Sequence, residues 1–481
     1  MPNGTLANLR RKPQFEFFLL ILAVLLVRTA AVVGCTECYQ EDIDSYGILA
    51  TNWAQSGTFG FMESDTLEAR PTAFRPPLYP WLLSCLVRHG QISSSALACL
   101  HILLGLVTVT LTWAIGKRVL AKRPMLAALA VTVDPLLLRN SQLVMTETLA
   151  TCLSVLVWWM WLVHLDRSAS VPVCNSAINC QRENKCGLHH GISALLAIRQ
   201  YGFLVLLGVL VGLSILTRPT AAPWALTLVC LVWFFSNQCV FRRTSSALSV
   251  MLGILICVVP WTLRNYALLG KPIWATSHGG YTLLLANNPY LYSHFSTSGP
   301  SRGWDAQPFH NRWLLRGEAV RHGIDVTQPE FWAPSDPIPS STGRTGQSPT
   351  YLPEIEDDAL AYSVAKATIQ RTPMMFLISS IYRAGWFWAW WPYHDSFSLS
   401  ACIIGMWYGG WSCLALVGLV AVIRSRQFKY WAPPLLLALV LTAAHSIYWS
   451  NMRMRSQLMT GVYLLAVFGA NATIQSRTKT N

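Results

Sequence analysis

The sequence predicts an all-α polytopic membrane protein with about ten transmembrane helices. Hydrophobic residues make up 53% of its 481 positions, and charged residues make up only 12%, compared with about 25% in a typical soluble domain. A membrane-spanning helix needs about 20 largely apolar residues. Apolar runs of this kind lie near residues 15–34, 95–116, 124–138, 143–164, 201–217, 220–236, 246–263, 401–423, 430–446 and 456–472.

The first apolar run resembles a signal peptide, because Arg10, Arg11 and Lys12 precede it. It lacks a small-residue cleavage site, however, and further spans follow it. We therefore expect a retained helix.

The positions of the basic residues predict which side of the membrane each loop faces, since Lys and Arg near span ends favour the cytoplasm. With the N-terminus inside, five further basic clusters also lie inside. They are Lys117 with Arg118, Lys122 with Arg123, Arg242 with Arg243, Arg424 with Arg426 and Lys429, and Arg477 with Lys479. This orientation requires the Trp-rich stretch 376–392 to lie at the membrane interface, where Trp is favoured, and not to span.

The predicted topology divides the chain into three parts. Residues 1–263 form an N-terminal transmembrane catalytic module with a first external loop, 35–94, and a cytoplasmic insert, 166–199. Residues 264–400 form a long external loop that contains the aromatic interfacial segment, and 401–481 form the C-terminal transmembrane helices. The net charge of +14 is then mostly a cytoplasmic-surface feature. No soluble segment interleaves a basic stripe with aromatic residues, so the charge does not indicate a nucleic-acid partner.

Acidic and basic residues from distant stretches of the chain share the predicted external face. Ionisable residues at a membrane face are costly and usually mark chemistry or transport. Arginine binds phosphate oxygens with a planar, always-charged fork, and a neighbouring carboxylate can accept the proton of an attacking hydroxyl. The residues concerned are Asp42, Asp44, Arg75, Glu147, Arg218, Arg264, Arg453 and Arg455. This combination suits a phosphate-linked substrate.

The loop motifs resemble those of the GT-C glycosyltransferases, most closely the group of protein O-mannosyltransferases and lipid A aminoarabinose transferases. The similarity starts with Asp42-Ile43-Asp44-Ser45-Tyr46 and continues with Ala73-Phe74-Arg75-Pro76-Pro77-Leu78-Tyr79-Pro80. In the same order follow Glu147 at the head of a span, Leu216 to Thr220, Pro260-Trp261 to Tyr266, Gly279-Gly280-Tyr281 and Asn287-Asn288-Pro289. The insert 166–199 departs from the pattern.

The resemblance implies a transferase that moves one sugar, a hexose or a pentose, from a polyprenyl-phosphate carrier to a hydroxyl of a lipid, glycan or protein, with inversion. It also implies interfacial helices in the first external loop and a mixed, partly irregular long loop. Asp42 is the implied base, with Asp44 as the alternative, and Glu147 could assist the base or help to hold a divalent metal ion. Arg75, Arg218 and Arg264 would bind the carrier phosphate. Arg453 and Arg455 lie in the last external turn, where we expect them to contact the phosphate or to anchor at the lipid headgroups, and we expect Tyr46 and Tyr79 to contact substrate.

Other interpretations of the same residues stay open. Asp42 and Asp44 could be solvated loop carboxylates, and the arginines could anchor at the lipid headgroups. A transporter or flippase of a lipid-linked or anionic substrate would also use about ten spans. Transporters usually place ionisable residues at mid-membrane and have interrupted helices in two related halves. The sequence shows neither feature, so we favour the transferase. A bacterial inner membrane is the favoured location, with the active site outside the cytoplasm.

Three further regions carry smaller predictions. Cys35 and Cys38 lie just outside the first span and could pair in an oxidising compartment. The insert holds Cys174, Cys180, Cys186, His189 and His190, whose spacing is unlike that of a structural zinc site. In the long loop, Glu354 to about Arg371 is predicted to form a solvated helix ended by Pro373, after a flexible stretch at 333–350.

Overall fold

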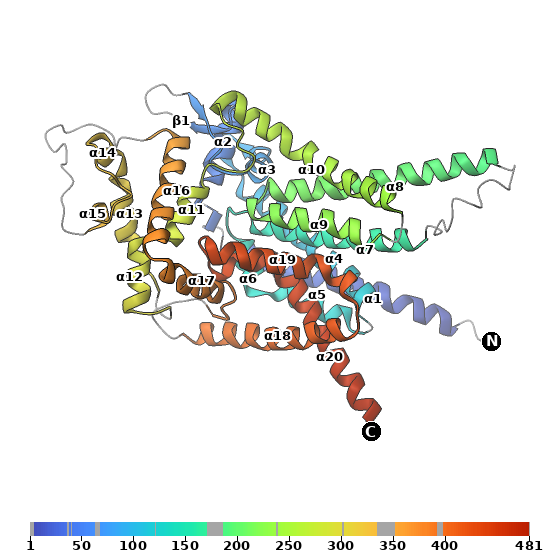
Figure 1. Cartoon of the computed structure of the whole chain (residues 1–481). Coiled ribbons are helices and arrows are strands. Elements are labelled where there is room, and N and C mark those ends of the chain that lie inside the picture. The colour runs from blue at the N-terminus through green and yellow to red at the C-terminus, as the bar shows by residue number, and fades with distance from the viewer. Residues whose placement is uncertain are drawn as a thin grey trace.

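Long helices lie side by side and form the body of the molecule, and shorter helices and two small hairpins gather at one end (Figure 1). The computed structural model describes residues 4–480 except 36–37, 40, 63–67, 121, 171–185, 237–238, 301–302, 334–351 and 392–397. Both termini lie at the end opposite the short helices (Figure 1). The main helices of the body are α1 (Gly4–Val33), α4 (Ser94–Val119), α5 (Pro124–Val133), α7 (Glu147–Ser170), α8 (Cys186–Ile215), α9 (Ala222–Phe234), α10 (Val240–Leu269), α18 (Leu399–Arg424), α19 (Phe428–Ile447) and α20 (Met459–Thr480).

The all-α membrane fold predicted from composition is confirmed. Within the described residues, seven helices are long and apolar enough to cross a membrane, and three shorter apolar helices cover 124–133, 199–215 and 219–234. Each of the ten overlaps one predicted span. The aromatic stretch belongs largely to α17 (Pro373–Phe387), which is not among these ten helices.

One predicted span, 124–138, is in fact two helices. α5 ends at Val133, and α6 (Pro135–Asn140) begins directly after Asp134. Asp134 accepts a hydrogen bond from Leu137 N at 2.7 Å, so its side chain caps the new helix in place of continuing the old one. Pro135 has no N–H to donate to the preceding turn, which also favours a helix start at this position.

Helices α8 and α10 approach closely because glycines face each other. A Cβ placed on Gly208 would lie 2.0 Å from Val250 O, and one placed on Gly253 would lie 2.1 Å from Val205 O. Small residues let helix backbones approach in a membrane, where packing takes the place of the hydrophobic effect between helices.

Replacing Gly208 with Ala is therefore expected to push α8 and α10 apart and to lower the thermal unfolding midpoint in detergent. Overpacking of this kind typically costs about 1–3 kcal/mol. Gly202→Ala, on the same helix, is the matched control, because nothing lies within 4 Å of its added methyl group. It should leave the midpoint unchanged or raise it, and equal losses in the two variants would contradict the close approach.

The first loop folds into short elements that lie at the loop end of the molecule. They are α2 (Tyr46–Ser56), α3 (Leu78–Ser84), the antiparallel pair β1 (Gly60–Met62) and β2 (Ala69–Pro71), and the pair β3 (Val87–Arg88) and β4 (Gln91–Ile92). Gly57 ends α2 with a φ of 73°, a conformation that glycine adopts without strain. The two short helices agree with the interfacial helices predicted for this loop.

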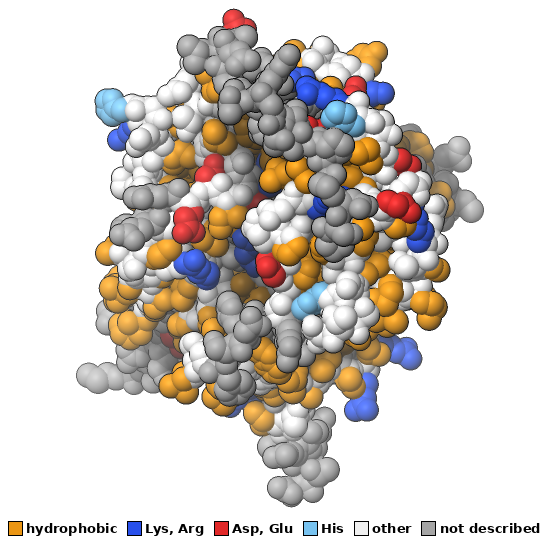
Figure 2. Space-filling model, turned by 90° about the vertical axis from the view of Figure 1, so that its left-hand side faces the viewer, with side chains coloured by type: hydrophobic (Ala, Val, Ile, Leu, Met, Phe, Trp, Pro, Cys, Tyr) orange, Lys and Arg blue, Asp and Glu red, His pale blue; other side chains and the backbone are white. Residues whose placement is uncertain are grey.

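The long loop forms a second group of short helices beside the first loop, at the same end of the molecule (Figure 1). Its helices are α11 (Gly279–Ala286), α12 (Pro289–Thr297), α13 (Gln307–Leu314), α14 (Arg316–Arg321), α15 (Pro329–Trp332), α16 (Glu354–Arg371) and α17. Phe309, Trp313 and Trp332 are buried in its core. Figure 2 looks onto this end of the molecule, where acidic, basic and histidine side chains lie among apolar ones.

The predicted helix 354–371 is confirmed as α16, but the prediction that its acidic start is solvated is wrong for Glu354. Its carboxylate accepts a hydrogen bond from Ala73 N at 2.9 Å and others from the hydroxyls of Thr72 and Ser277. Glu354 thus ties the long loop to the first loop. The predicted flexible stretch, apart from Ala333, lies outside the described residues, as do Cys174 and Cys180; for Cys186, His189 and His190 only the backbone is described.

Candidate functional site

Asp44 and Arg75 pair within the first loop. Arg75 Nη2 donates to Asp44 Oδ1 at 3.0 Å, and Arg75 Nε donates to the Asp44 carbonyl at 2.9 Å. The guanidinium lies 5.4 Å from the centre of the Tyr46 ring and 4.7 Å from that of Phe74. Because Arg75 starts a stiff turn through Pro76, its backbone is held in place, and the aromatic rings fix its side chain against the Asp44 carboxylate.

Glu147 lies beside arginines from two other segments of the chain, and one of these arginines also reaches Asp44. Glu147 begins α7, and its side chain is only 1% exposed. Arg453 Nε lies 3.0 Å from Glu147 Oε1 and Arg218 Nη2 lies 3.7 Å from it, while Arg453 Nη2 lies 3.9 Å from Asp44 Oδ2. Arg453 therefore links the two carboxylates. We call Asp44, Glu147, Arg75, Arg218 and Arg453 the charged cluster.

The hydrogen-bonding capacity of the charged cluster is only partly used. The contacts of Glu147 with Arg218 and Arg453 do not have hydrogen-bond geometry. Both carboxylate oxygens of Glu147 are therefore buried without a hydrogen-bond donor in the described structure. Arg218 Nη1 is likewise buried without an acceptor. Arg218 Nη2 donates to Met454 Sδ at 2.9 Å, and Arg453 Nη1 donates to Met145 Sδ. A thioether is a weak acceptor. These guanidinium groups can therefore turn to a stronger acceptor, and the three arginines exceed the two carboxylates by one positive charge.

Met145 and Met454 were not predicted as site residues. Met145 stands two residues before Glu147, and Met454 stands between Arg453 and Arg455. A methionine next to charged residues at the end of an apolar span was the one signal that could have found them. Only the contacts show that the sulfurs hold the arginines.

Arg264 lies outside the charged cluster. It is on α10 and donates from Nη1 to Thr72 O at 2.6 Å and from Nη2 to Phe59 O at 2.8 Å. Its guanidinium stacks 5.1 Å from the centre of the Trp261 ring. Arg264 thus holds the first loop onto α10, and its predicted contact with carrier phosphate stays a prediction.

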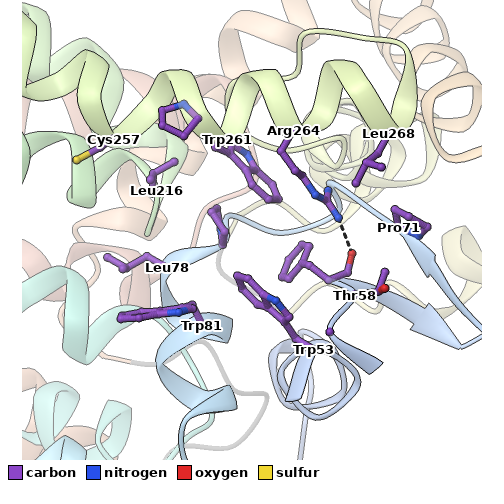
Figure 3. Close-up of a pocket in the computed structure, with 14 residues that line it drawn as sticks. Trp53, Thr58, Pro71, Leu78, Trp81, Leu216, Cys257, Trp261, Arg264 and Leu268 are labelled. Carbon is purple, nitrogen blue, oxygen red and sulfur yellow. Dashed lines mark hydrogen bonds between the residues drawn. The ribbon is translucent and has the colours of Figure 1, made fainter. Parts of the chain in front are cut away.

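Arg264 also lines a groove of about 590 Å³ between α2, α3 and α10. The walls are mainly apolar, and three tryptophans, Trp53, Trp81 and Trp261, contribute to them (Figure 3). Arg264 and Thr58 lie toward one end of the groove, and Cys257 lies toward the other (Figure 3). The groove therefore combines an aromatic lining with a cation near one end.

Asp42 lies apart from the charged cluster as well. Its Oδ2 accepts a hydrogen bond from Ile48 N at 2.8 Å, so the side chain caps the start of α2. Its Oδ1 is buried without a partner, and no ion pair joins Asp42 to an arginine within the described residues. The base role inferred for Asp42 stays a prediction. Asp44, the alternative, is the first-loop carboxylate that the structure brings to the arginines.

Tyr46 and Tyr79 are buried behind the charged cluster with their rings edge to face, 5.5 Å apart. The Tyr79 hydroxyl lies 3.0 Å from His101 Nε2, and His101 Nδ1 lies 2.9 Å from the carbonyl of Ser141. Because Nδ1 must donate to that carbonyl, Nε2 accepts, and the tyrosine donates its only proton to it. Burial raises the pKa of both tyrosines. Their predicted contact with substrate stays a prediction.

Arg455 belongs to a different environment, although it is only two residues from Arg453. Its side chain is 2% exposed, and the guanidinium lies 4.7 Å from the centre of the Tyr408 ring. It donates to Ala389 O and, at 3.4 Å, to Phe387 O. The structure does not bring Arg455 to Asp44 or Glu147, so a phosphate contact would need it to leave these partners.

His278 lies next to Arg75, with its ring centre 4.4 Å from that of Phe74 and 4.9 Å from that of Tyr281. Burial lowers the pKa of His278 to about 3, and the charge of Arg75 acts in the same direction. The imidazole is therefore neutral at physiological pH.

This pKa predicts a loss of stability in acid. As the pH falls below about 6.5, the ordinary pKa of histidine, the unfolded chain binds a proton at His278 that the folded chain does not bind until pH 3. Between pH 7 and pH 5 this group should cost roughly 1–2 kcal/mol of folding free energy. The thermal midpoint of the wild type should fall more steeply over this range than that of His278→Gln, and parallel pH profiles would contradict the assignment.

The two sulfurs of Cys35 and Cys38 form a disulfide, as the sequence suggested. Arg139 Nη1 lies 3.3 Å from Cys38 Sγ, so the disulfide packs against the end of α6. Tyr39 follows directly, and its hydroxyl donates to Ser141 O at 2.6 Å. These contacts hold residues 139–141, which precede α7 and Glu147 in the sequence, against the start of the first loop.

The charged cluster does not provide the ligands that a divalent metal ion prefers. Within the described residues, no group of three or more His, Cys, Asp or Glu side chains could hold a metal ion. Arg453 lies between Asp44 and Glu147, so a guanidinium takes the place between the carboxylates that an ion would need.

No protein-family model matches the chain, and no curated protein matches it. Among solved structures it is similar to the archaeal oligosaccharyltransferase AglB from Archaeoglobus fulgidus in complex with an inhibitory peptide and a dolichol-phosphate, with 14% identity, a TM-score of 0.48 and coverage of 97% of this chain and 51% of that one. It is also similar to ArnT from Cupriavidus metallidurans bound to undecaprenyl phosphate, with 15% identity, a TM-score of 0.36 and coverage of 95% and 77%. The chain thus spans about half the length of AglB.

Proposed function

We propose that this chain is a membrane glycosyltransferase that moves a sugar from a polyprenyl-phosphate carrier to a hydroxyl acceptor on the non-cytoplasmic face, with inversion. The observation that carries this proposal is the charged cluster. Four separate segments of the chain, in the first loop, at the head of α7, before α9 and before α20, bring Asp44, Glu147 and three arginines together. A scaffold or a packing role does not require charges from four segments to meet at one place.

In this proposal Asp44 is the general base, which takes the proton of the acceptor hydroxyl. Its side chain is 28% exposed, whereas that of Glu147 is 1% exposed. In the proposed step, the acceptor oxygen forms a bond to the anomeric carbon while the bond from that carbon to the phosphate oxygen breaks. The proton of the hydroxyl goes to Asp44, and the electron pair leaves with the carrier phosphate. A single displacement of this kind inverts the anomeric centre.

The arginines stabilise the leaving group. A phosphate that departs with an extra negative charge needs cations already in place, because preorganised charges cost no reorganisation during the reaction. Arg453 and Arg218 each donate a hydrogen bond to a methionine sulfur, which is a weak acceptor. Phosphate oxygens would take the place of the sulfurs and form stronger, charge-assisted hydrogen bonds. Glu147 keeps both arginines beside the site before the donor arrives.

The groove between α2, α3 and α10 is the proposed seat of the carrier's hydrocarbon chain. Its tryptophans and prolines offer an apolar surface, and Arg264 is the cation on its wall. In this proposal the carrier lies along the groove with its phosphate toward the arginines. A bacterial inner membrane is the proposed setting, with the charged cluster outside the cytoplasm; lipid, glycan and protein hydroxyls are the acceptor classes.

Comparing cells with and without the chain tests the function most directly. Mass spectrometry of lipid, glycan and protein fractions should show one class that gains a hexose or pentose only when the chain is present. Purified protein in liposomes with a polyprenyl-monophosphate sugar should release polyprenyl phosphate. A flippase would move the lipid between leaflets and leave the sugar attached, so movement without release would overturn the transferase.

Donor binding tests the role of the arginines separately. Arg75→Ala is expected to weaken binding of polyprenyl phosphate by about 10- to 100-fold, the equivalent of one charge-assisted hydrogen bond. Arg70→Ala is the matched control, since Arg70 is an exposed arginine of the same loop. The binding constants come from titration of the labelled lipid in detergent, and equal affinity of Arg75→Ala and wild type would remove Arg75 from the site.

A further inference from the structure

We propose that Arg455 is a positioning residue, which acts from behind the helix that carries Arg453 and so orients Arg453 toward Asp44 and Glu147. Its effect on sugar transfer rests on the proposed function, whereas its effect on the position of Arg453 does not. Both arginines belong to η4 (Met452–Leu458), a short 3₁₀ helix between α19 and α20.

The two arginines leave η4 in different directions. A 3₁₀ helix has about three residues per turn, so side chains two positions apart cannot share a face. Arg453 reaches Glu147 and Asp44, and Arg455 reaches the end of α17 and the ring of Tyr408 on α18. Asn451 caps the start of η4, with its side chain accepting from Arg453 N at 3.1 Å. The turn of the helix thus couples the two arginines.

On its own side of η4, Arg455 holds the end of a helix. The carbonyls of Phe387 and Ala389, at the C-terminal end of α17, accept its Nη1. Free carbonyls at a helix C-terminus carry partial negative charge and favour a cation. Arg455 therefore joins η4 to α17 by hydrogen bonds that a side chain without an N–H or O–H donor, such as Met, cannot make.

A buried carboxylate completes this environment. Asp134 accepts from the hydroxyls of Tyr408, at 3.2 Å, and Tyr463. Tyr408 contacts both Asp134 and Arg455, with its hydroxyl on Asp134 and its ring under the guanidinium. Asp134, Tyr408 and Tyr463 come from three parts of the chain, and the hydrogen bond from Tyr408 to Asp134 holds the ring on which the Arg455 guanidinium lies.

Arg455 is too deeply placed to bind phosphate itself. Its side chain is 2% exposed, yet Nε and Nη2 have no partner in the described structure. A buried guanidinium with unused donors is costly. The contacts to α17 offset part of that cost. In the structure they form together with the position of η4 that turns Arg453 toward the carboxylates.

A double-mutant cycle between Arg453→Ala and Arg455→Met tests the coupling. In the wild-type background, Arg455→Met should lower the rate of sugar transfer about 10- to 100-fold; in the Arg453→Ala background, where no guanidinium is left to orient, it should lower the rate less than about 3-fold. Losses that are equal in the two backgrounds would show that Arg455 acts independently of Arg453, and would overturn the proposal.

Thermal unfolding of the same four proteins gives a readout that needs no activity. If Arg455 orients Arg453, the drop in Tm caused by Arg455→Met should be smaller when Arg453 is already Ala. Arg455→Lys keeps the charge and loses the fork, and it repeats the cycle if the Met variant does not fold. If the wild-type protein has no transfer activity, the proposed function is refuted, but the Tm values still decide the role of Arg455. If Arg455→Met lowers Tm equally in the wild-type and Arg453→Ala backgrounds, only the role of Arg455 is refuted.

Discussion

Replacing Asp44 with Asn is expected to lower the rate of sugar transfer by about 10²- to 10⁴-fold, the usual contribution of a general base, while the protein stays folded. The amide keeps an oxygen that Arg75 can bind but cannot accept a proton. Asp44 and Arg75 are 28% and 17% exposed, and an ion pair open to solvent contributes little, about 0–1 kcal/mol. The rate is measured as release of polyprenyl phosphate from the lipid-linked sugar, and the fold by thermal unfolding.

Asp42→Asn is the matched variant, because it makes the same chemical change two residues away. Asparagine caps a helix about as well as aspartate does, so the contact with Ile48 N should survive. If Asp44 is the base, Asp42→Asn should retain most of the activity. Loss of transfer in Asp42→Asn together with near-normal transfer in Asp44→Asn would return the base role to Asp42, as the motif resemblance implies.

Removing Arg453 is expected to have the largest effect on stability. Glu147 is 1% exposed, and taking away one partner of a buried ion pair costs about 3–5 kcal/mol. Arg218 remains 3.7 Å from Glu147, which places the expected loss in Arg453→Ala toward the lower value. The loss would appear as a lower thermal midpoint in detergent. Transfer should become slower but stay measurable, because the leaving phosphate loses one cation while Arg75 and Arg218 remain.

Adding Glu147→Gln to Arg453→Ala separates the two effects. The second change removes the buried charge that had lost its partner, so part of the stability should return. The rate of transfer should not recover, since Arg453 is still absent. If the double variant were less stable than Arg453→Ala alone, the buried charge of Glu147 would not be the source of the loss.

The membrane fold followed from local features of the sequence. Length and apolar content are enough to specify a spanning helix, because in a bilayer every backbone group must be satisfied within the segment. The boundary that was missed, at Asp134-Pro135, lies inside an apolar run and depends on a capping contact to Leu137 N. The solvated start predicted for α16 was wrong for Glu354 because Thr72, Ala73 and Ser277 come from loops far away in the chain.

In the candidate site, too, the residue types followed from the sequence and their partners did not. The structure pairs Arg75 with Asp44, and Arg218 and Arg453 with Glu147; the sequence had placed these residues on one face without pairing them. Arg264 and Arg455 are arginines at span ends like Arg218 and Arg453, yet they donate to backbone carbonyls and not to carboxylates. A sequence pattern can identify an arginine at a membrane face, but it cannot say which acceptor its side chain meets.

The sequence by itself determined that this protein is a bundle of membrane helices with carboxylates and arginines in its loops, because hydrophobic length and charge position are properties of the chain. Tertiary structure alone decided that Asp44, and not Asp42, meets the arginines, and that Arg453 reaches Glu147 while Arg455 turns away. The physical reason is that an ion pair depends on distances of a few ångströms between segments far apart in the chain, and only the packing of the helices sets those distances.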